Sequence, residues 1–168
     1  MDIPSIKYLE SCPPPTLVRM QIAGASCFAF LGLHKTAFFP AFALMPTGRW
    51  EVQNLSASHG LMPEYEGVSA LDFGGQFEIK INYSGECNLD KGSLFRSPGA
   101  IIRTKDSILL AASAARGWRD PVQYLDLKTG VQQGEPGGMR AAFADWSVFL
   151  SPGDDRPLLR SVAERIEL

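Results

Sequence analysis

Short runs of alternating apolar and polar residues, broken by glycine and proline, constrain the fold of this chain more than any other feature. The 168 residues include 16 glycines and 12 prolines, which leave little room for long helices. In the clearest run, residues 77–83, apolar side chains alternate with Glu78, Lys80 and Asn82. A period of two is typical of a half-buried strand. The sequence therefore predicts a mainly β protein.

Other predicted strands follow at short and regular spacing. They cover residues 17–22, 27–33, 38–45, 50–53, 101–102, 108–112, 122–127, 131–133 and 142–150, and residues 86–89 can pair back on the run 77–83. Turn residues at 84–85, 105–106 and 128–130 predict that the strands beside them pair as hairpins. Eight to ten strands at this spacing predict an antiparallel sandwich or an open barrel.

Two segments fall outside this pattern of strands. Residues 1–15 contain Pro13-Pro14-Pro15 and predict an extended, proline-rich arm that precedes a single β domain at 16–168. Residues 56–72 have no clear period and predict a long loop, a kind of segment that often carries function.

The end of the chain changes character. Leu158, Leu159, Val162 and Ile166 recur at helical spacing, and Pro157 suits a first helical turn. We therefore expect one C-terminal helix that packs its apolar stripe on the sheet.

Charge and cysteine usage exclude several classes of function. The net charge of −2 argues against a dedicated nucleic-acid binder, which normally carries a basic excess. The most membrane-like stretch, 27–46, is interrupted by polar residues and Pro40, so no membrane segment is expected. Cys12, Cys27 and Cys87 form no metal-binding pair, and Cys27 is expected to be buried. These features and the absence of a signal peptide predict a soluble cytoplasmic protein.

No motif in the sequence identifies catalytic chemistry. The two histidines, His34 and His59, stand in no known metal or nucleophile pattern, and the glycine pairs match no phosphate-binding loop. We therefore expect no catalytic residue, no metal and no cofactor. A site that combines His59 with nearby carboxylates is the alternative, since imidazole and carboxylate groups can share one metal ion.

Two features suggest that the chain binds a partner. Acidic residues concentrate between positions 64 and 90, where a single lysine accompanies Glu64, Glu66, Asp72, Glu78, Glu86 and Asp90. A concentrated negative field attracts a basic partner, so Glu64, Glu66 and Asp72 are predicted contacts.

The second feature is a glycine-containing loop in which Trp118 lies between Arg116 and Arg119. Tryptophan and arginine are over-represented at interface hot spots, so these three residues are also predicted contacts.

The sequence therefore predicts a non-enzymatic module that binds another, basic protein. Small acidic proteins that neutralise a basic enzyme, such as bacterial immunity proteins and inhibitors, share this physical profile, although no motif identifies such a family. The alternative is a small enzyme, or a binder of a small ligand or carbohydrate, with a pocket near His59 and the 56–72 loop.

Overall fold

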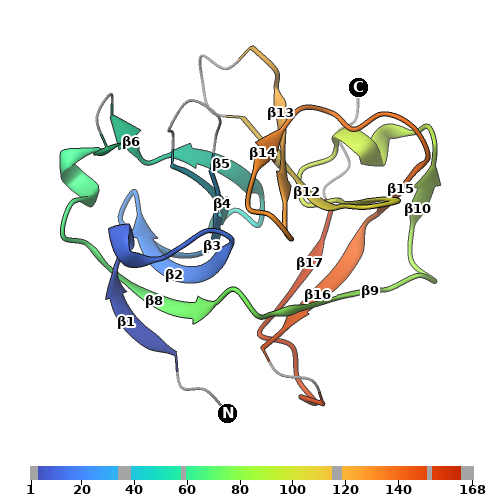
Figure 1. Cartoon of the computed structure of the whole chain (residues 1–168). Helices are drawn as coiled ribbons and strands as arrows, with labels where there is room; N and C mark the ends of the chain where they lie inside the picture. Colours follow the sequence, from blue (N-terminus) through green and yellow to red (C-terminus); the bar gives the residue numbers. More distant parts are fainter. Residues whose placement is uncertain (1–3, 34–38, 58–59, 115–118, 151–152, 164–168) are drawn as a thin grey trace.

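The computed structural model describes residues 4–33, 39–57, 60–114, 119–150 and 153–163 (Figure 1). The chain is mainly β, as predicted. Within the described ranges the helical pieces are three short 3-10 turns, η1 (Leu9–Ser11), η2 (Pro63–Tyr65) and η3 (Ser93–Arg96). In those ranges no helix has the length and apolar character needed to span a membrane.

One large sheet organises most of the chain. Its main path runs β1-β8-β2-β3-β4-β5-β12-β11-β15-β10, and β13 and β14 extend it beside β12. Its twelve strands are β1 Ser5–Tyr8, β2 Thr16–Ile22, β3 Ala25–Leu31, β4 Pro40–Leu44, β5 Trp50–Asn54, β8 Ser69–Gly74, β10 Cys87–Leu89, β11 Ile101–Thr104, β12 Ile108–Ser113, β13 Val122–Asp126, β14 Gln132–Gln133 and β15 Arg140–Phe143.

In the described ranges the two halves of this sheet are joined by parallel contacts: one pairing between strands, β12 with β5, and an isolated bridge between Leu33 and Val131. Ser113 of β12 lies opposite Glu51 of β5, whereas every other pairing between the strands of the sheet is antiparallel. Two smaller sheets complete the fold. One has the order β17-β16-β9, and the other pairs β6 with β7. Their strands are β6 Ser56–Ala57, β7 Gly60–Leu61, β9 Glu78–Ile81, β16 Asp145–Phe149 and β17 Leu159–Val162.

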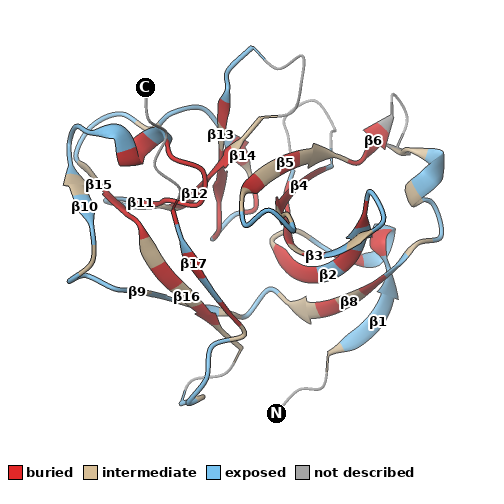
Figure 2. Cartoon of the chain, turned by 180° about the vertical axis from the view of Figure 1, so that it is seen from behind, coloured by how far each residue is buried: buried red, intermediate tan, exposed pale blue. Residues whose placement is uncertain are grey.

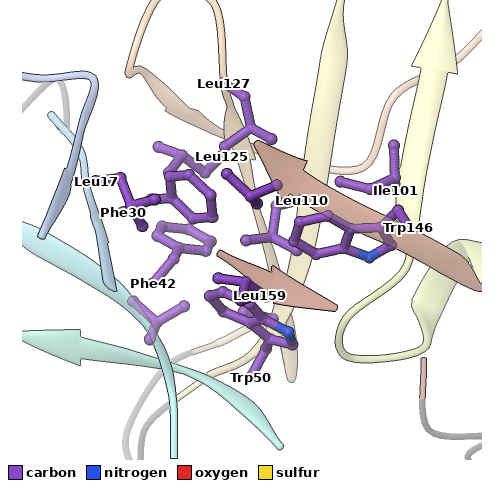
Figure 3. Close-up of a cluster of buried hydrophobic side chains, with 13 residues drawn as sticks. Leu17, Phe30, Phe42, Trp50, Ile101, Leu110, Leu125, Leu127, Trp146 and Leu159 are labelled. Carbon is purple, nitrogen blue, oxygen red and sulfur yellow. The ribbon is translucent and has the colours of Figure 1, made fainter. Parts of the chain in front are cut away.

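The main hydrophobic core lies between the large sheet and the three-stranded sheet. This first core takes buried side chains from strands of both sheets and of both halves of the chain (Figure 3). It contains Leu17, Phe30, Phe42, Trp50, Val52, Ile101, Leu110, Ala112, Leu125, Leu127, Trp146, Val148 and Leu159. Burial of this much apolar surface is the main favourable contribution to folding.

Two tryptophans tie the sheets together inside the first core. The rings of Trp50 on β5 and Trp146 on β16 lie 5.7 Å apart between centroids. Trp50 Nε1 donates a hydrogen bond to Ser161 Oγ at 2.9 Å, and Trp146 Nε1 donates to the Gly99 carbonyl at 2.7 Å. Both indole N–H groups are therefore satisfied, which removes the penalty of burying them.

Each half of the large sheet buries its opposite face as well. In β3, Phe28 and Phe30 face the first core, whereas Cys27 and Ala29 face a second cluster covered by η1 and the β6–β7 region. In the other half, η3 covers a third cluster that includes Tyr124. The central strands are therefore apolar on both sides, as the continuous apolar run at 27–33 predicts.

The predicted C-terminal helix is wrong, because residues 159–162 form the strand β17. Leu159 and Ser161 are buried while Arg160 and Val162 are exposed, which is a period of two. The segment 158–163 fits helical and strand spacing about equally well over so few residues, and pairing with β16 decides between them. Residues 164–168, with Ile166, lie outside the described ranges.

Three local predictions also need correction. The segment 86–89 does not pair back on β9: β10 joins β15, and β9 joins β16. The predicted strand 142–150 divides into β15 and β16, which belong to different sheets. The predicted loop 56–72 contains β6, β7, η2 and the start of β8. The hairpins β11–β12 and β13–β14 are confirmed.

Residues of the predicted N-terminal arm take part in the fold. β1 pairs with β8 at the edge of the large sheet, and η1 follows it directly. Leu9 and Cys12 are buried in the second cluster. Pro14 and Pro15 pack against the backbone at Gly130, where an added Cβ would approach Pro15 N to 2.9 Å.

Replacing Gly99 with alanine should destabilise the first core. Gly99 has φ +88°, and an added Cβ would lie 2.9 Å from Trp50 Cδ1. We expect the free energy of unfolding to fall by about 2–4 kcal/mol, from backbone strain plus overpacking. Gly48 has φ +85° and nothing within 4 Å of an added Cβ. Gly48→Ala therefore measures the cost of backbone strain without a clash, about 1 kcal/mol. Urea unfolding of both variants measures the difference; equal losses would contradict the predicted clash with Trp50.

The phenol of Tyr124 should make the fold sensitive to alkali. Its hydroxyl donates a hydrogen bond to the Phe95 carbonyl at 2.7 Å, and burial raises the pKa of Tyr124 from 10.0 to about 12. The neutral phenol of Tyr124 therefore stabilises the folded state, and this stabilisation is complete below pH 10. It is lost as the pH rises from 10 to 12, because the folded state favours only the neutral phenol. It amounts to roughly 2–3 kcal/mol.

Urea unfolding across this pH range provides the test. The loss of stability between pH 10 and 12 should be smaller in Tyr124→Phe by the same amount, since that variant has no phenol to ionise at this position. Tyr8→Phe, at a residue that is 59% exposed, is the control and should keep the alkaline loss of the wild type. An unchanged profile in Tyr124→Phe would show that the buried phenol does not cause the loss.

Candidate functional site

The residues that the sequence predicts as partner contacts lie in different surroundings. Glu64 on η2 and Glu66 just after it are exposed, and so is Arg119. Arg116 and Trp118 lie outside the described residues. The predicted contact around the tryptophan therefore stays a prediction.

Asp72 is a buried link between two strands. It is only 5% exposed, and one of its carboxylate oxygens lies 2.7 Å from Lys7 Nζ on β1. Its other oxygen accepts a hydrogen bond from the backbone N–H of Gly74 at 2.7 Å. The hydrogen bond from Lys7 to Asp72 raises the pKa of the lysine. These contacts hold β1 against β8 and leave little of the carboxylate for a partner.

The remaining acidic residues of the 64–90 segment do not gather on one surface. Glu64 and Glu66 lie at η2, Glu78 on β9, and Asp90 directly after β10. Figure 1 shows η2 and β10 at opposite sides of the molecule. The negative charge that is concentrated in the sequence is therefore spread out in space.

Metal-ligating and nucleophilic side chains are also dispersed. In the described ranges no three His, Cys, Asp or Glu side chains are grouped so that they could hold a metal ion. His34 and His59 lie outside those ranges, so the alternative site near His59 stays untested. Cys27 is buried, as predicted, and the Cys87 thiol is exposed.

A shallow depression opens beside the second cluster. Its empty volume is about 280 Å³, open solvent included, and Leu9, Glu10, Cys12, Leu31 and Leu55 contribute to its walls. Burial raises the pKa of the Cys12 thiol, and the nearby Asp72 carboxylate acts in the same direction. The neutral thiol behaves as a small apolar group, so the lining of the depression resembles the edge of a hydrophobic core.

A partly exposed surface lies on the face of the large sheet that also carries the first core. We call it the outer face and define it by Ile6, Tyr8, Arg19, Phe28 and Leu71. Ile6 is 77% exposed and Tyr8 59% exposed. Figure 2 shows that β1 is exposed along its length. Among the described strands β1 pairs only with β8, which places it at the edge of the large sheet.

The strand register places these side chains in one row. Ile6 lies opposite Leu71, Leu71 opposite Arg19, and Arg19 opposite Phe28. Directly paired residues in a sheet point to the same face, so the three pairings form one line across β1, β8, β2 and β3.

Arg19 is fixed within this row by two contacts. Its Nε donates a hydrogen bond to Ser26 Oγ at 2.8 Å, and its guanidinium carbon lies 5.0 Å from the centre of the Phe28 ring. The Phe28 ring in turn lies 5.8 Å from that of Phe73. Arg19 is nevertheless exposed, which leaves the other nitrogens of its guanidinium directed to solvent.

A second exposed apolar surface lies at the opposite end of the sheet, around β10. Leu89 is 69% exposed and Tyr83 61% exposed. Here the neighbouring arginine is already engaged, because Arg103 Nη1 donates to Tyr83 Oη at 2.9 Å and the tyrosine ring packs edge-on against Phe143. This surface is therefore less open to new polar contacts than the outer face.

The sequence predictions missed the outer face. Ile6 and Tyr8 alternate with Ser5 and Lys7, a period of two that indicates a strand, but the prolines that follow favoured an arm. Arg19 lies within the predicted strand 17–22, which the structure shows as β2. Its neighbours on the outer face come from β1, β8 and β3, and only the pairing of strands reveals them.

Reversing the charge of Asp72 should destabilise the fold. In Asp72→Lys a buried ammonium would face Lys7 in place of its partner, and we expect the melting temperature to fall by about 6–12 °C. The control is Glu66→Lys at an exposed position, which should shift the melting temperature by no more than about 2 °C. Differential scanning calorimetry measures both; a tolerated Asp72→Lys would show that the Lys7–Asp72 pair does not hold β1.

Comparisons with protein-family models, curated proteins and solved structures find no match to this chain. The candidate site is therefore chosen from the structure of this chain alone. The outer face is chosen because it combines an edge strand, exposed apolar side chains and an exposed arginine.

Proposed function

We propose that this protein is a protein-binding module and that its partner packs on the outer face. The observation that carries the proposal is the exposure of Ile6 and Tyr8 on the edge strand β1, in a row that continues through Leu71 to Arg19. Exposed apolar groups at a sheet edge invite association, and proteins usually protect such edges unless they are used for binding.

The continuity of the outer face with the first core supports this proposal. Across the sheet, the row continues from Phe28 to Leu44 and then to Trp50, which is 1% exposed. One line of side chains thus begins inside the core and ends on the surface at Ile6. Where the three-stranded sheet does not cover it, this face of the large sheet still carries apolar side chains, which a further layer would bury.

The residue types agree with this function. Tyrosine and arginine are enriched among the residues that contribute most to binding in protein interfaces. Tyr8 lies two residues from the exposed Ile6 on β1, and Arg19 lies beyond Leu71 in the same row. Aromatic side chains also lose little conformational entropy when they are covered.

The more specific sequence prediction, neutralisation of a basic partner as by an immunity protein or inhibitor, stays a proposal. Glu64 and Glu66 are exposed acids that precede the outer-face strand β8, and they are the residues through which a basic partner would be attracted. Asp72, the third predicted contact, is buried against Lys7 and offers less of its carboxylate to such a partner.

Peptide selection tests the use of the outer face. A displayed library of random peptides is selected on the immobilised full chain, and the enriched peptides are titrated against Ile6→Ser/Tyr8→Ser. We expect affinity to fall about tenfold or more, since two exposed anchors are lost. The matched control is Leu89→Ser/Met139→Ser, at positions that are 69% and 82% exposed elsewhere on the molecule, and it should bind within about twofold of the wild type.

Two outcomes would reject the proposal. One is enrichment of peptides that bind the wild type and the outer-face variant equally well. The other is a selection that enriches no binder at all. Melting temperatures of both double variants, which alter exposed side chains, establish that each remains folded.

A further inference from the structure

Arg19, like Arg103, has no carboxylate partner among the described residues, whereas three other arginines do. Arg96 and Arg140 both contact Glu135, and Arg160 contacts Asp145 through two nitrogens. Among the described residues no carboxylate lies within ion-pair distance of Arg19. Its side chain contacts Ser26 and Phe28 instead.

The surroundings of Arg19 on its own face contain no acid. The nearest same-face positions along β2, β3 and β8 are Gln21, Ser26, Phe28, Ser69 and Leu71. The guanidinium therefore stands as an uncompensated positive charge within an apolar and neutral polar surface. An interface that covers it must supply a negative group, because a buried unpaired charge is costly.

The two contacts of Arg19 also prepare it for such a group. Ser26 occupies Nε, and the Phe28 ring supports the guanidinium at 5.0 Å, so the side chain is already oriented before binding. The remaining nitrogens form the edge that takes a carboxylate through two parallel hydrogen bonds. Preorganisation of this kind reduces the entropy lost on association.

We infer that the partner on the outer face places a carboxylate on Arg19 and an apolar side chain against Ile6 and Leu71. This inference rests on the proposed function, since it specifies the chemistry of the partner at that same surface. It requires one acidic side chain at the contact and is compatible with a partner that is basic overall.

A second copy of this chain does not meet the requirement. In a two-fold symmetric dimer the same surface serves both partners, and the outer face contains no carboxylate to offer Arg19. A nucleic acid does not meet it either, because binding to a phosphate backbone normally uses several cations, whereas this face has one. The occupant is therefore a different protein segment that carries an Asp or Glu beside an apolar residue.

The sequences and affinities of selected peptides test the inference. We expect the peptides that require Ile6 and Tyr8 to share an Asp or Glu next to an apolar residue. Their affinity should fall about tenfold or more in Arg19→Gln, because hydrogen bonds between charged groups are lost. Arg19→Lys, which keeps the charge and loses the planar fork, should lie between wild type and Arg19→Gln.

A matched control and a salt titration separate the carboxylate contact from general effects. Arg103→Gln removes an exposed arginine at the other end of the sheet and should leave affinity unchanged. Raising the salt concentration should weaken binding to the wild type more than binding to Arg19→Gln, since exposed charge pairs are screened.

The alternative outcomes are distinguishable. Peptides that need Ile6 and Tyr8 but carry no conserved acid, and are indifferent to Arg19→Gln, overturn the inference and leave the proposed function standing. Peptides indifferent to all three residues overturn both. A wild-type dimer in sedimentation that dissociates in Ile6→Ser would assign the outer face to a second copy and overturn the inference.

Discussion

The contact between Trp50 and Trp146 is the constraint on which the rest of this structure depends. It joins the large sheet to the three-stranded sheet across 5.7 Å, and each indole N–H is satisfied by a group from a third segment, Ser161 or Gly99. Packing and hydrogen bonding therefore fix the same arrangement of strands distant in the sequence. Gly99 is required there because its backbone approaches the Trp50 ring where a side chain would not fit.

The same arrangement also explains why the proposed binding surface lies at the edge of the fold. The three-stranded sheet covers the first core over Trp50, but the row of paired side chains continues past it to Phe28, Arg19 and Ile6. The large sheet is thus wider than the layer that covers it. Side chains suited to a core at one end of the row become, at the other end, a surface that a partner can complete.

The sequence predicted what depends on neighbours along the chain and failed where distant pairing decides. Alternation located β2, β5 and β9, and the glycine turn at Gly130, with φ +75°, located the β13–β14 hairpin. The separation of β9 from β10, and of β15 from β16, depends on long-range partners that no local pattern specifies. β17 shows the same limit: Leu159 and Val162 fit both a helix and a strand, and β16 selects the strand.

The candidate site was hidden for a related reason. The acidic residues of 64–90 are close in sequence but do not form one surface. The reason is that β8 and β10 lie near opposite ends of the large sheet, while β9 belongs to the three-stranded sheet. Arg19 and Ile6 were visible as single residues, yet β8, some fifty residues further along the chain, lies between their strands. Because neighbouring strands of this sheet are distant in the sequence, the side chains of the outer face come together only when the strands pair in their final register. The residues of the proposed binding surface are therefore brought together by the same strand pairings that define the fold.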